Sequence, residues 1–383
     1  MTRRPRRPEQ RGRSLVGEYL DVDIGPVAHG GHCVARHESR VIFVRHALPG
    51  ERVTVRVTEG DEESRFLRGD AVAVLAASED RVPAPCRLAG PGACGGCDFQ
   101  HVALPAQRSL KAAVVAEQMW RLARLEVDVE VEPVPGDVDG LRWRTRVQYA
   151  VDREGRRGFR KHRSHGVVPV DDCLITRTDA RAVVGRSAVV KRPPVVEIVD
   201  IAAGRREFEV AADGFWQVHP GAPELLVDVV LSMLRPAPGE RCLDLYAGVG
   251  LFSAFLAGAV GPTGSVVAIE ADWIAVEHAR ANLSTYPSAT VRRGSVDRDL
   301  GSRPPEPVDL VVLDPPREGA KRAVVDQVAD RLPRAVAYVA CDPAALARDV
   351  ALFADRGYRI TSLRAFDLFP MTHHVECVAL LEH

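Results

Sequence analysis

The sequence predicts a multidomain α/β protein with three parts: an N-terminal OB-like β-barrel, a central α+β domain and a C-terminal doubly wound, Rossmann-like sheet. Three observations predict this class. Short β-branched runs between turn residues occupy 15–77, and prolines, glycines and cysteines are concentrated in 80–100. From Arg241 onward, apolar segments of strand length alternate with segments of helical spacing. Such alternation is typical of a parallel sheet covered by helices.

The length of 383 residues is enough for two or three domains. We place the boundaries at a tail of residues 1–14, a barrel over 15–77, a central domain over 78–212 and a doubly wound domain over 213–383. The tail is rich in arginine and proline and is expected to be disordered. Neither an apolar run of membrane-spanning length nor a secretory leader is present, which predicts a cytoplasmic protein with no membrane partner. We expect a monomer.

The net charge of −1 excludes a protein that is basic throughout. Positive charge is instead concentrated in two places. Six arginines and one glutamate lie in the first thirteen residues. Between Leu141 and His165 there are nine arginines or lysines and only two acidic residues. This distribution favours contact with RNA or DNA at particular places. A solvated tail and a basic surface loop are the alternative.

The barrel is predicted from strand-like runs such as Val41–Val44 and Glu51–Val57, which are separated by turn signals at Gly25-Pro26, Gly30-Gly31 and Leu48–Gly50. Short strands at regular spacing are typical of a small closed barrel. OB-like barrels often bind single-stranded nucleic acid. Such a barrel is equally compatible with a purely structural role. Beyond it, helical spacing covers 107–125 and strands are expected again over 141–210.

A glycine turn follows the first strand of the doubly wound region, in the run Cys242–Gly250. Gly248 and Gly250 allow a ligand to approach the backbone, and Asp244 stands in the strand before the turn. The next strand ends in Glu270, which can accept hydrogen bonds from two ribose hydroxyls. Nicotinamide enzymes use a similar turn, so the turn alone decides little. The pattern resembles the first motifs of class I methyltransferases, which bind S-adenosylmethionine.

A later strand ends in Asp314-Pro315-Pro316 and is followed by Arg317. Enzymes that methylate exocyclic amines usually carry an aromatic residue at that position. The arginine therefore counts against amine methylation.

Cys341 follows the apolar strand that ends at Ala340, and ligands bind at this end of the strands in doubly wound folds. Asp342 and Pro343 suit the cap and first residue of the next helix. A thiol at a helix N-terminus is biased toward the thiolate, although a lone strand cysteine is more commonly inert. Glu376 interrupts an apolar strand and must be either paired or catalytic. It is a candidate general base.

Together these motifs resemble the RNA uracil-5-methyltransferase family, whose members act on tRNA or 23S rRNA, over nearly the whole chain. Tyr338–Pro343 with Ala347-Arg348-Asp349 resembles the nucleophile signature, His374–Glu376 the general-base signature, and Phe215–His219 the opening of the catalytic domain. The resemblance implies that Cys341 adds to uracil C6 and that Glu376 removes the C5 proton. The residues implied at the cofactor are Gln217, Asp244, Tyr246, Gly248, Gly250, Glu270, Asp297 and Asp314.

Three positions depart from the commoner family pattern: His219 and Asp342 replace asparagines, and Ala345 replaces a threonine. None of them removes a reacting group, but they leave the finer contacts to cofactor and base undefined.

Four of the eight cysteines form a candidate metal site, namely Cys86, Cys94, Cys97 and Cys173. Four thiolates suit zinc or an iron–sulfur cluster, and the spacing does not distinguish them; unrelated free thiols are a further alternative. The run Cys94–Cys97 with Asp98–His101 resembles the 4Fe-4S site of the rRNA-modifying branch, although the gap after Cys86 is longer. The resemblance thus favours 23S rRNA, with tRNA as the alternative.

The N-terminal barrel resembles the TRAM domain of these enzymes, which implies that it binds RNA. The basic stretch from Arg142 to Arg163 is a second candidate for RNA contact. Two other functions remain open: a non-catalytic iron–sulfur RNA-binding protein, and a methyltransferase that acts on another atom or on protein.

Overall fold

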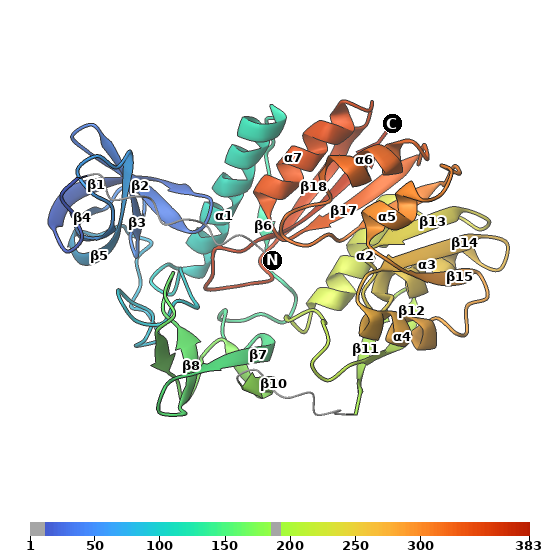
Figure 1. Cartoon of the computed structure of the whole chain (residues 1–383), viewed down its shortest axis with the longest axis horizontal. Coiled ribbons are helices and arrows are strands. Elements are labelled where there is room, and N and C mark those ends of the chain that lie inside the picture. Colours follow the sequence, from blue (N-terminus) through green and yellow to red (C-terminus); the bar gives the residue numbers. More distant parts are fainter. Residues whose placement is uncertain (1–11, 185–192) are drawn as a thin grey trace. The chain divides into compact units, whose positions relative to one another are not determined.

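The computed structural model describes residues 12–184 and 193–383 (Figure 1). Most of the predicted N-terminal tail therefore lies outside the described residues. The chain forms two compact units. The first consists of the residues up to Leu110 together with Val151–Asp171 and Met371–His373, and the second consists of Lys111–Ala150, Asp172–Pro370 and His374–His383. Residues 78–212 are thus shared between both units, and the boundaries of the expected central domain remain a prediction.

The first unit contains a closed barrel with strand order β1-β2-β3-β5-β4. Its strands are β1 (Tyr19–Ala28), β2 (His32–His37), β3 (Arg40–Arg45), β4 (Arg52–Glu59) and β5 (Phe66–Ala76). Side chains alternate between the two faces of each strand, so Val53, Val55 and Val57 of β4 all point into the barrel. They are almost fully buried and fill its apolar interior. The predicted OB-like barrel is confirmed.

The remainder of the first unit is less regular. The cysteine-rich segment follows the barrel and leads into helix α1 (Leu104–Gln118), whose later turns belong to the second unit. The helix predicted over 107–125 is present as α1 together with a π-helix, Met119–Ala123, that follows it directly. A small antiparallel hairpin of β8 (Arg157–Arg160) and β9 (Val167–Pro169) completes the unit.

The second unit is built on an eight-stranded sheet with the order β15-β14-β13-β16-β17-β19-β18-β6. The strands are β6 (Val131–Glu132), β13 (Arg241–Leu245), β14 (Ser265–Glu270), β15 (Ala289–Arg293), β16 (Leu310–Leu313), β17 (Ala335–Ala340), β18 (Arg359–Phe366) and β19 (Glu376–Glu382). β13 to β17 are parallel, whereas β19 runs antiparallel between β17 and β18. The predicted doubly wound fold is confirmed.

Helices cover both faces of this sheet, which explains its continuous apolar strands. The helices are α2 (Ala222–Leu234), α3 (Leu251–Val260), α4 (Trp273–Asn282), α5 (Val296–Gly301), α6 (Lys321–Ala329) and α7 (Pro343–Ala354). Within β16, Leu310 and Val312 join a core with α2 and α3, while Val311 and Leu313 join a second core with α6 and α7. β16 therefore contributes to two cores.

Two strand pairs lie outside this sheet in the second unit. β7 (Arg144–Val151) pairs in parallel with β10 (Thr176–Val184), and β11 (Val195–Ile201) forms an antiparallel hairpin with β12 (Gly204–Val210). None of the helices in the described ranges is both long and apolar enough to cross a bilayer.

Candidate active site

The glycine turn between β13 and α3 forms an open cradle. Gly248 has φ +55° and Gly250 has φ +90°, a region that favours glycine because a side chain is strained there. A Cβ placed on Gly248 would meet no described atom within 4 Å apart from its chain neighbours. The backbone N–H of Gly248 donates to Glu270 Oε2 at 2.9 Å, so the turn is held against the end of β14.

Three carboxylates meet at the carboxyl ends of neighbouring strands. Asp244 is fully buried; its Oδ2 accepts from Ser253 Oγ at 2.5 Å, and its Oδ1 has no hydrogen-bond partner among the described residues. Burial and the charge of Glu270 raise the pKa of Asp244 to about 6. Burial together with Asp244 and Glu270 raises the pKa of Asp314 to about 7.

This arrangement fits a cationic ligand with hydrogen-bond donors. Carboxylates that raise one another's pKa are relieved when a positive charge is bound beside them. The unpartnered oxygen of Asp244 can accept from such a ligand, and the open space over Gly248 leaves room for it. S-adenosylmethionine has a cationic sulfonium, an ammonium group and ribose hydroxyls, so the residues present fit it.

The other residues expected at the cofactor, Tyr246, Asp297 and Gln217, are not part of the group of three carboxylates. Asp297, in the first turn of α5, lies near enough to Tyr246 to act with burial in raising the pKa of that phenol to about 12. Gln217 is half-buried in the loop between β12 and α2, beside Trp216, which packs on Phe208. His219, the departure from the family pattern, is buried and stacks on Trp143, and its Nδ1 accepts from Gly221 N at 3.2 Å.

Cys341 and Glu376 are brought together by an antiparallel pair of strands. Ala340 at the end of β17 lies opposite Cys377 of β19, so the next residues, Cys341 and Glu376, face each other. Side chains at facing positions lie on the same side of the sheet. The two residues are far apart in the sequence, and the sheet register joins them.

The protonation of Cys341 differs from the prediction. Burial and the charge of Glu376 raise the pKa of the Cys341 thiol to about 12. Asp342 does cap α7, since its side chain accepts from Ala345 N at 2.8 Å. However, burial and neighbouring carboxylates outweigh the helix N-terminus, so the resting residue is a thiol. The pKa of Glu376 is also well above its usual range, because the side chain is buried beside Asp314.

The positive charge of Arg317 opposes the rise in the pKa of Cys341 and the rise in the pKa of Glu376. Its charge lowers the pKa of the Cys341 thiol and of the Glu376 carboxyl, and its Nη2 lies 3.3 Å from His374 Nε2. The sequence includes Arg317 in the Asp314–Arg317 motif and as an argument against amine methylation, but assigns it no role toward Cys341 or Glu376. Its place directly after two prolines at a strand end was the available signal for a role in the site.

Asp349 is a second residue whose role the sequence did not reveal. Its Oδ2 accepts from Tyr338 Oη at 2.6 Å and from Ala320 N at 2.7 Å. These bonds join α7 to the segment that follows Arg317. The available signal was its place in the Ala347-Arg348-Asp349 part of the nucleophile signature.

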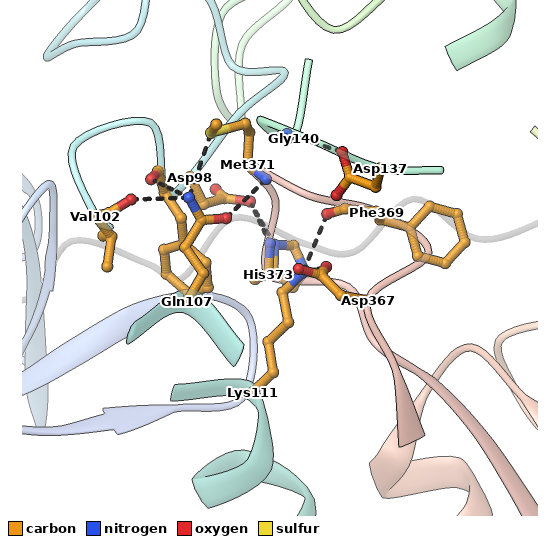
Figure 2. A network of polar contacts seen from close by, with 11 residues as sticks. Asp98, Val102, Gln107, Lys111, Asp137, Gly140, Asp367, Phe369, Met371 and His373 are labelled. Atoms are coloured by element: carbon orange, nitrogen blue, oxygen red, sulfur yellow. Dashed lines mark hydrogen bonds and ion pairs between the residues drawn. The ribbon is translucent and has the colours of Figure 1, made fainter. Parts of the chain in front are cut away.

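The connection between β18 and β19, which ends on Glu376, is anchored on both of its sides. In the second unit, the fully buried Lys111 donates to Asp367 Oδ1 at 2.5 Å and to the carbonyl of Phe369 at 3.1 Å (Figure 2). In the first unit, Gln107 Oε1 accepts from Met371 N at 2.8 Å and its Nε2 contacts Met371 Sδ (Figure 2). Gln107 and Lys111 are one turn apart on α1.

The predicted four-cysteine site is not shown. Cys86, Cys94 and Cys97 belong to the first unit, and Cys173 belongs to the second. Within the described parts of the chain, no group of three or more histidine, cysteine or acidic side chains is placed to hold a metal ion. The amide of Gln100 instead donates to Cys97 Sγ and accepts from Cys86 N. Among the described side chains, these cysteines are therefore not shown to form a metal or cluster site.

Comparison with protein families identifies three segments. Residues 13–72 match the TRAM domain, 224–339 match the methyltransferase small domain, and 306–383 match the tRNA (uracil-5-)-methyltransferase family. A crystal structure of the Pyrococcus abyssi tRNA (uracil-54, C5)-methyltransferase with S-adenosyl-L-homocysteine is similar in fold, with a TM-score of 0.69 and 22% identity, over 94% of this chain and 100% of that chain.

Curated relatives match almost end to end. An uncharacterised RNA methyltransferase of Streptomyces avermitilis is 47% identical over 96% of this chain and 99% of its own length. Others from Bifidobacterium longum and Bdellovibrio bacteriovorus are 38% and 33% identical, covering 94% and 97% of this chain and 96% and 98% of their own lengths. The chain therefore belongs to this family of RNA methyltransferases, with a TRAM domain at its N-terminus.

Proposed function

We propose that the protein methylates C5 of a uridine in RNA from S-adenosylmethionine, with Cys341 as the nucleophile and Glu376 as the base. The observation that carries the proposal is the position of Cys341 opposite Glu376, at the end of β17 and β19 and near Asp314. The family match over 306–383, which includes both residues, agrees with it.

The cofactor site is assigned to the cradle at Gly248 and the three carboxylates around it. Glu270 is positioned for the ribose, and Asp244 and Asp314 for the donors and positive charge of the ligand. S-adenosylmethionine bound there supplies an electrophilic methyl group.

The reaction requires activation of C5, which is a poor nucleophile. The Cys341 thiol gives its proton to solvent water, and its Sγ forms a bond to C6, which moves the electron pair of the C5–C6 double bond toward C5 and the O4 carbonyl. C5 then forms its bond to the methyl group as the methyl–sulfur bond breaks. Glu376 removes the C5 proton, the C5–C6 double bond forms again, and Sγ leaves as a thiolate.

Arg317 is proposed to assist both groups. The raised pKa of Cys341 requires a nearby positive charge for the thiolate to form, and Arg317 is the cation that lowers it. Glu376 is protonated more readily than an exposed glutamate, which makes it a stronger base once it has ionised. The target uridine must leave its stack to reach this buried site.

The RNA is proposed to be 23S rRNA, which the resemblance of the cysteine motif favours, with tRNA as the second candidate. The Pyrococcus abyssi protein of similar fold is named for uracil 54 of tRNA. Assay of the purified enzyme on unmodified 23S rRNA and tRNA transcripts, followed by mapping of 5-methyluridine, decides between them.

The mechanism is tested with Cys341→Ala and Glu376→Gln on the RNA that the wild type methylates. Cys341→Ala should transfer no methyl group. Glu376→Gln should accumulate a methylated covalent RNA–protein adduct that persists in a denaturing gel. An active Cys341→Ala variant contradicts the mechanism. Methylated nucleosides other than 5-methyluridine would indicate a different target atom, and RNA binding without any methylation would indicate a non-catalytic protein.

A 4Fe-4S cluster at Cys86, Cys94, Cys97 and Cys173 is a separate proposal that rests on the resemblance alone. Iron and sulfide analysis of anaerobically purified protein tests it. Stoichiometric zinc without iron would refute the cluster.

A further inference from the structure

The connection between β18 and β19 has a tip, Met371–His373, that belongs to the first unit, although the strands on both sides of it belong to the second. Glu376 begins β19 three residues after this tip. Only His374 and Val375 lie between His373 and Glu376, so at most roughly 11 Å of chain separates the two Cα atoms. A shift of the tip can therefore reach the proposed base through a very short segment.

Two segments of the first unit bind the backbone of Met371. Its carbonyl oxygen accepts from Asp98 N and from Phe99 N, both at 3.0 Å. Its N–H donates to Gln107 Oε1 at 2.8 Å, and Gln107 Nε2 donates to the carbonyl of Phe99 at 3.1 Å (Figure 2). Both polar groups of the Met371 backbone are thus bonded within the first unit.

Met371 has a backbone conformation that residues other than glycine seldom adopt. Its φ is +66°, in the left-handed region. Such a conformation costs about 1–3 kcal/mol, persists only where the surrounding contacts over-determine it, and is concentrated at functional sites. The bonds with Asp98, Phe99 and Gln107 supply those contacts. A connection that served only to join two strands would not need this strain.

The side chain of His373 is held as closely as the backbone before it. Its Nδ1 donates to Asp98 Oδ2 at 2.6 Å, and the same oxygen accepts from His373 N at 3.3 Å (Figure 2). The other oxygen of Asp98 accepts from Arg45 Nη2 at 3.3 Å. A Cβ placed on Gly31 would lie 2.6 Å from the Cβ of His373, so the turn between β1 and β2 packs directly against this residue. Asp98, whose side chain is only 10% exposed, is the centre of these contacts.

We infer that Asp98 and His373 are positioning residues for Glu376, and that the pair fixes the start of β19 so that Glu376 stays opposite Cys341 when the C5 proton is removed. The inference rests on the proposed function, in which Glu376 is the base. It gives the first unit a part in catalysis without placing any of its side chains at the reacting atoms. A purely stabilising contact is the competing interpretation, but the strain at Met371 and the short link to Glu376 favour positioning.

The test measures the step that Glu376 performs, on the RNA that the wild type methylates. Poor placement of the base should leave methyl transfer to C5 intact and slow removal of the C5 proton roughly 10–100-fold. Asp98→Ala should therefore accumulate the methylated covalent RNA–protein adduct in a denaturing gel, as expected for Glu376→Gln. The Kd values for RNA and for S-adenosyl-L-homocysteine should stay at those of the wild type.

Further variants separate positioning from stability. His373→Asn keeps a nitrogen close to the position of Nδ1 and should release product at nearly the wild-type rate, whereas His373→Ala should accumulate adduct. His373 is 29% exposed, so His373→Ala carries the test if Asp98→Ala fails to fold. Arg81→Met is the matched control, because it leaves the buried Glu51 of the same unit without its cation. It should lower the midpoint of urea unfolding without changing the fraction of adduct.

A wild-type fraction of adduct in both Asp98→Ala and His373→Ala overturns the inference and leaves these contacts a structural role. Equal accumulation in Arg81→Met also overturns it, because loss of stability alone would then explain the adduct. Equal product release by His373→Asn and His373→Ala would contradict it as well. If Glu376→Gln forms adduct and the other variants do not, only the inference fails. An absence of adduct in Glu376→Gln overturns the proposed mechanism, and the inference with it.

Discussion

The barrel and the eight-stranded sheet hold their charged side chains in opposite environments. In the barrel, Arg68 and Glu59 remain partly exposed, and Arg68 lies over the exposed ring of Phe66. In the sheet, Asp244 and Glu376 are buried at strand ends, and burial is the largest cause of their raised pKa values. Attraction of a long polyanion needs charge that is accessible over a surface, whereas bond-making is helped by charge shielded from water. Substitutions in the sheet should therefore affect rate and stability, and substitutions on the barrel should affect RNA affinity.

The largest effect is expected for Cys341→Ser. The substitution is nearly isosteric, but the hydroxyl is a much weaker nucleophile, so methyl transfer should fall on the order of 10⁴-fold or more. RNA affinity, measured by fluorescence anisotropy, should remain close to that of the wild type. A loss of RNA affinity as large as the loss of methyl transfer would contradict the proposed division of roles between sheet and barrel.

Lys111→Met should destabilise the protein by about 3–5 kcal/mol, because it leaves the carboxylate of Asp367 buried without its cation. Urea unfolding measures the change. Arg177→Met is the matched control, since it removes an exposed pair with Asp179, and it should leave stability almost unchanged. The double variant Lys111→Met, Asp367→Leu should recover part of the loss. Equal effects of the buried and exposed pairs would contradict the comparison.

Asp314→Asn should stabilise the free protein at pH 8 and abolish most of its activity. The folded pKa of Asp314, about 7, lies above its ordinary value of 3.8, so the folded state binds the proton more tightly. Its contribution to stability is complete below pH 3.8 and is lost as the pH rises through 7. The free energy of unfolding of the variant should therefore exceed that of the wild type by more at pH 8 than at pH 5. The difference between the two pH values should be on the order of 2 kcal/mol.

Urea unfolding at both pH values measures this gain. Asp128→Asn, at an exposed position, should show no such difference between pH 5 and pH 8. If Asp314→Asn stabilised the protein equally at the two pH values, the pKa of the Asp314 carboxyl would not be raised in the folded state.

Gly248→Ala should have the smallest effect on stability, about 1 kcal/mol, from the strain of alanine at positive φ. Its Cβ would also fill the open cradle, so affinity for S-adenosyl-L-homocysteine should fall in calorimetric titration. Gly136→Ala is the matched control, because Gly136 has φ +86° and similarly open space. It should show the same stability change with unaltered affinity. A similar loss of affinity in both variants would contradict the assignment of Gly248 to the cofactor site.

Several features were predictable because their signal is local in sequence. The barrel strands follow from alternation that is visible within each segment, as in Val53 to Val57. The doubly wound sheet follows from continuous apolar runs such as Ala335–Ala340. The candidate site residues Asp244, Asp314 and Cys341 were found because each adjoins a strand end or turn that the pattern already marks.

Other features could not be predicted because they depend on partners far apart in the chain. Lys111 and Asp367 are separated by 256 positions, and no pattern near either residue announces the pair. The role of Asp349 depends on where the segment at Ala320 folds back. The four-cysteine site was inferred from spacing and resemblance, and neither of these establishes that the thiols reach ligand geometry.

The sequence by itself determined the fold class, the family and the positions of Cys341 and Glu376, because local periodicity and motif spacing specify elements and the residues at their ends. Only the tertiary structure decided that β19 runs antiparallel beside β17 and so places Glu376 opposite Cys341. It also decided that Cys341 is a thiol at rest, with Arg317 opposing the shift. The reason is physical: a helix N-terminus acts through neighbouring atoms of the same segment, whereas burial and charge act through every group that the fold assembles around the sulfur.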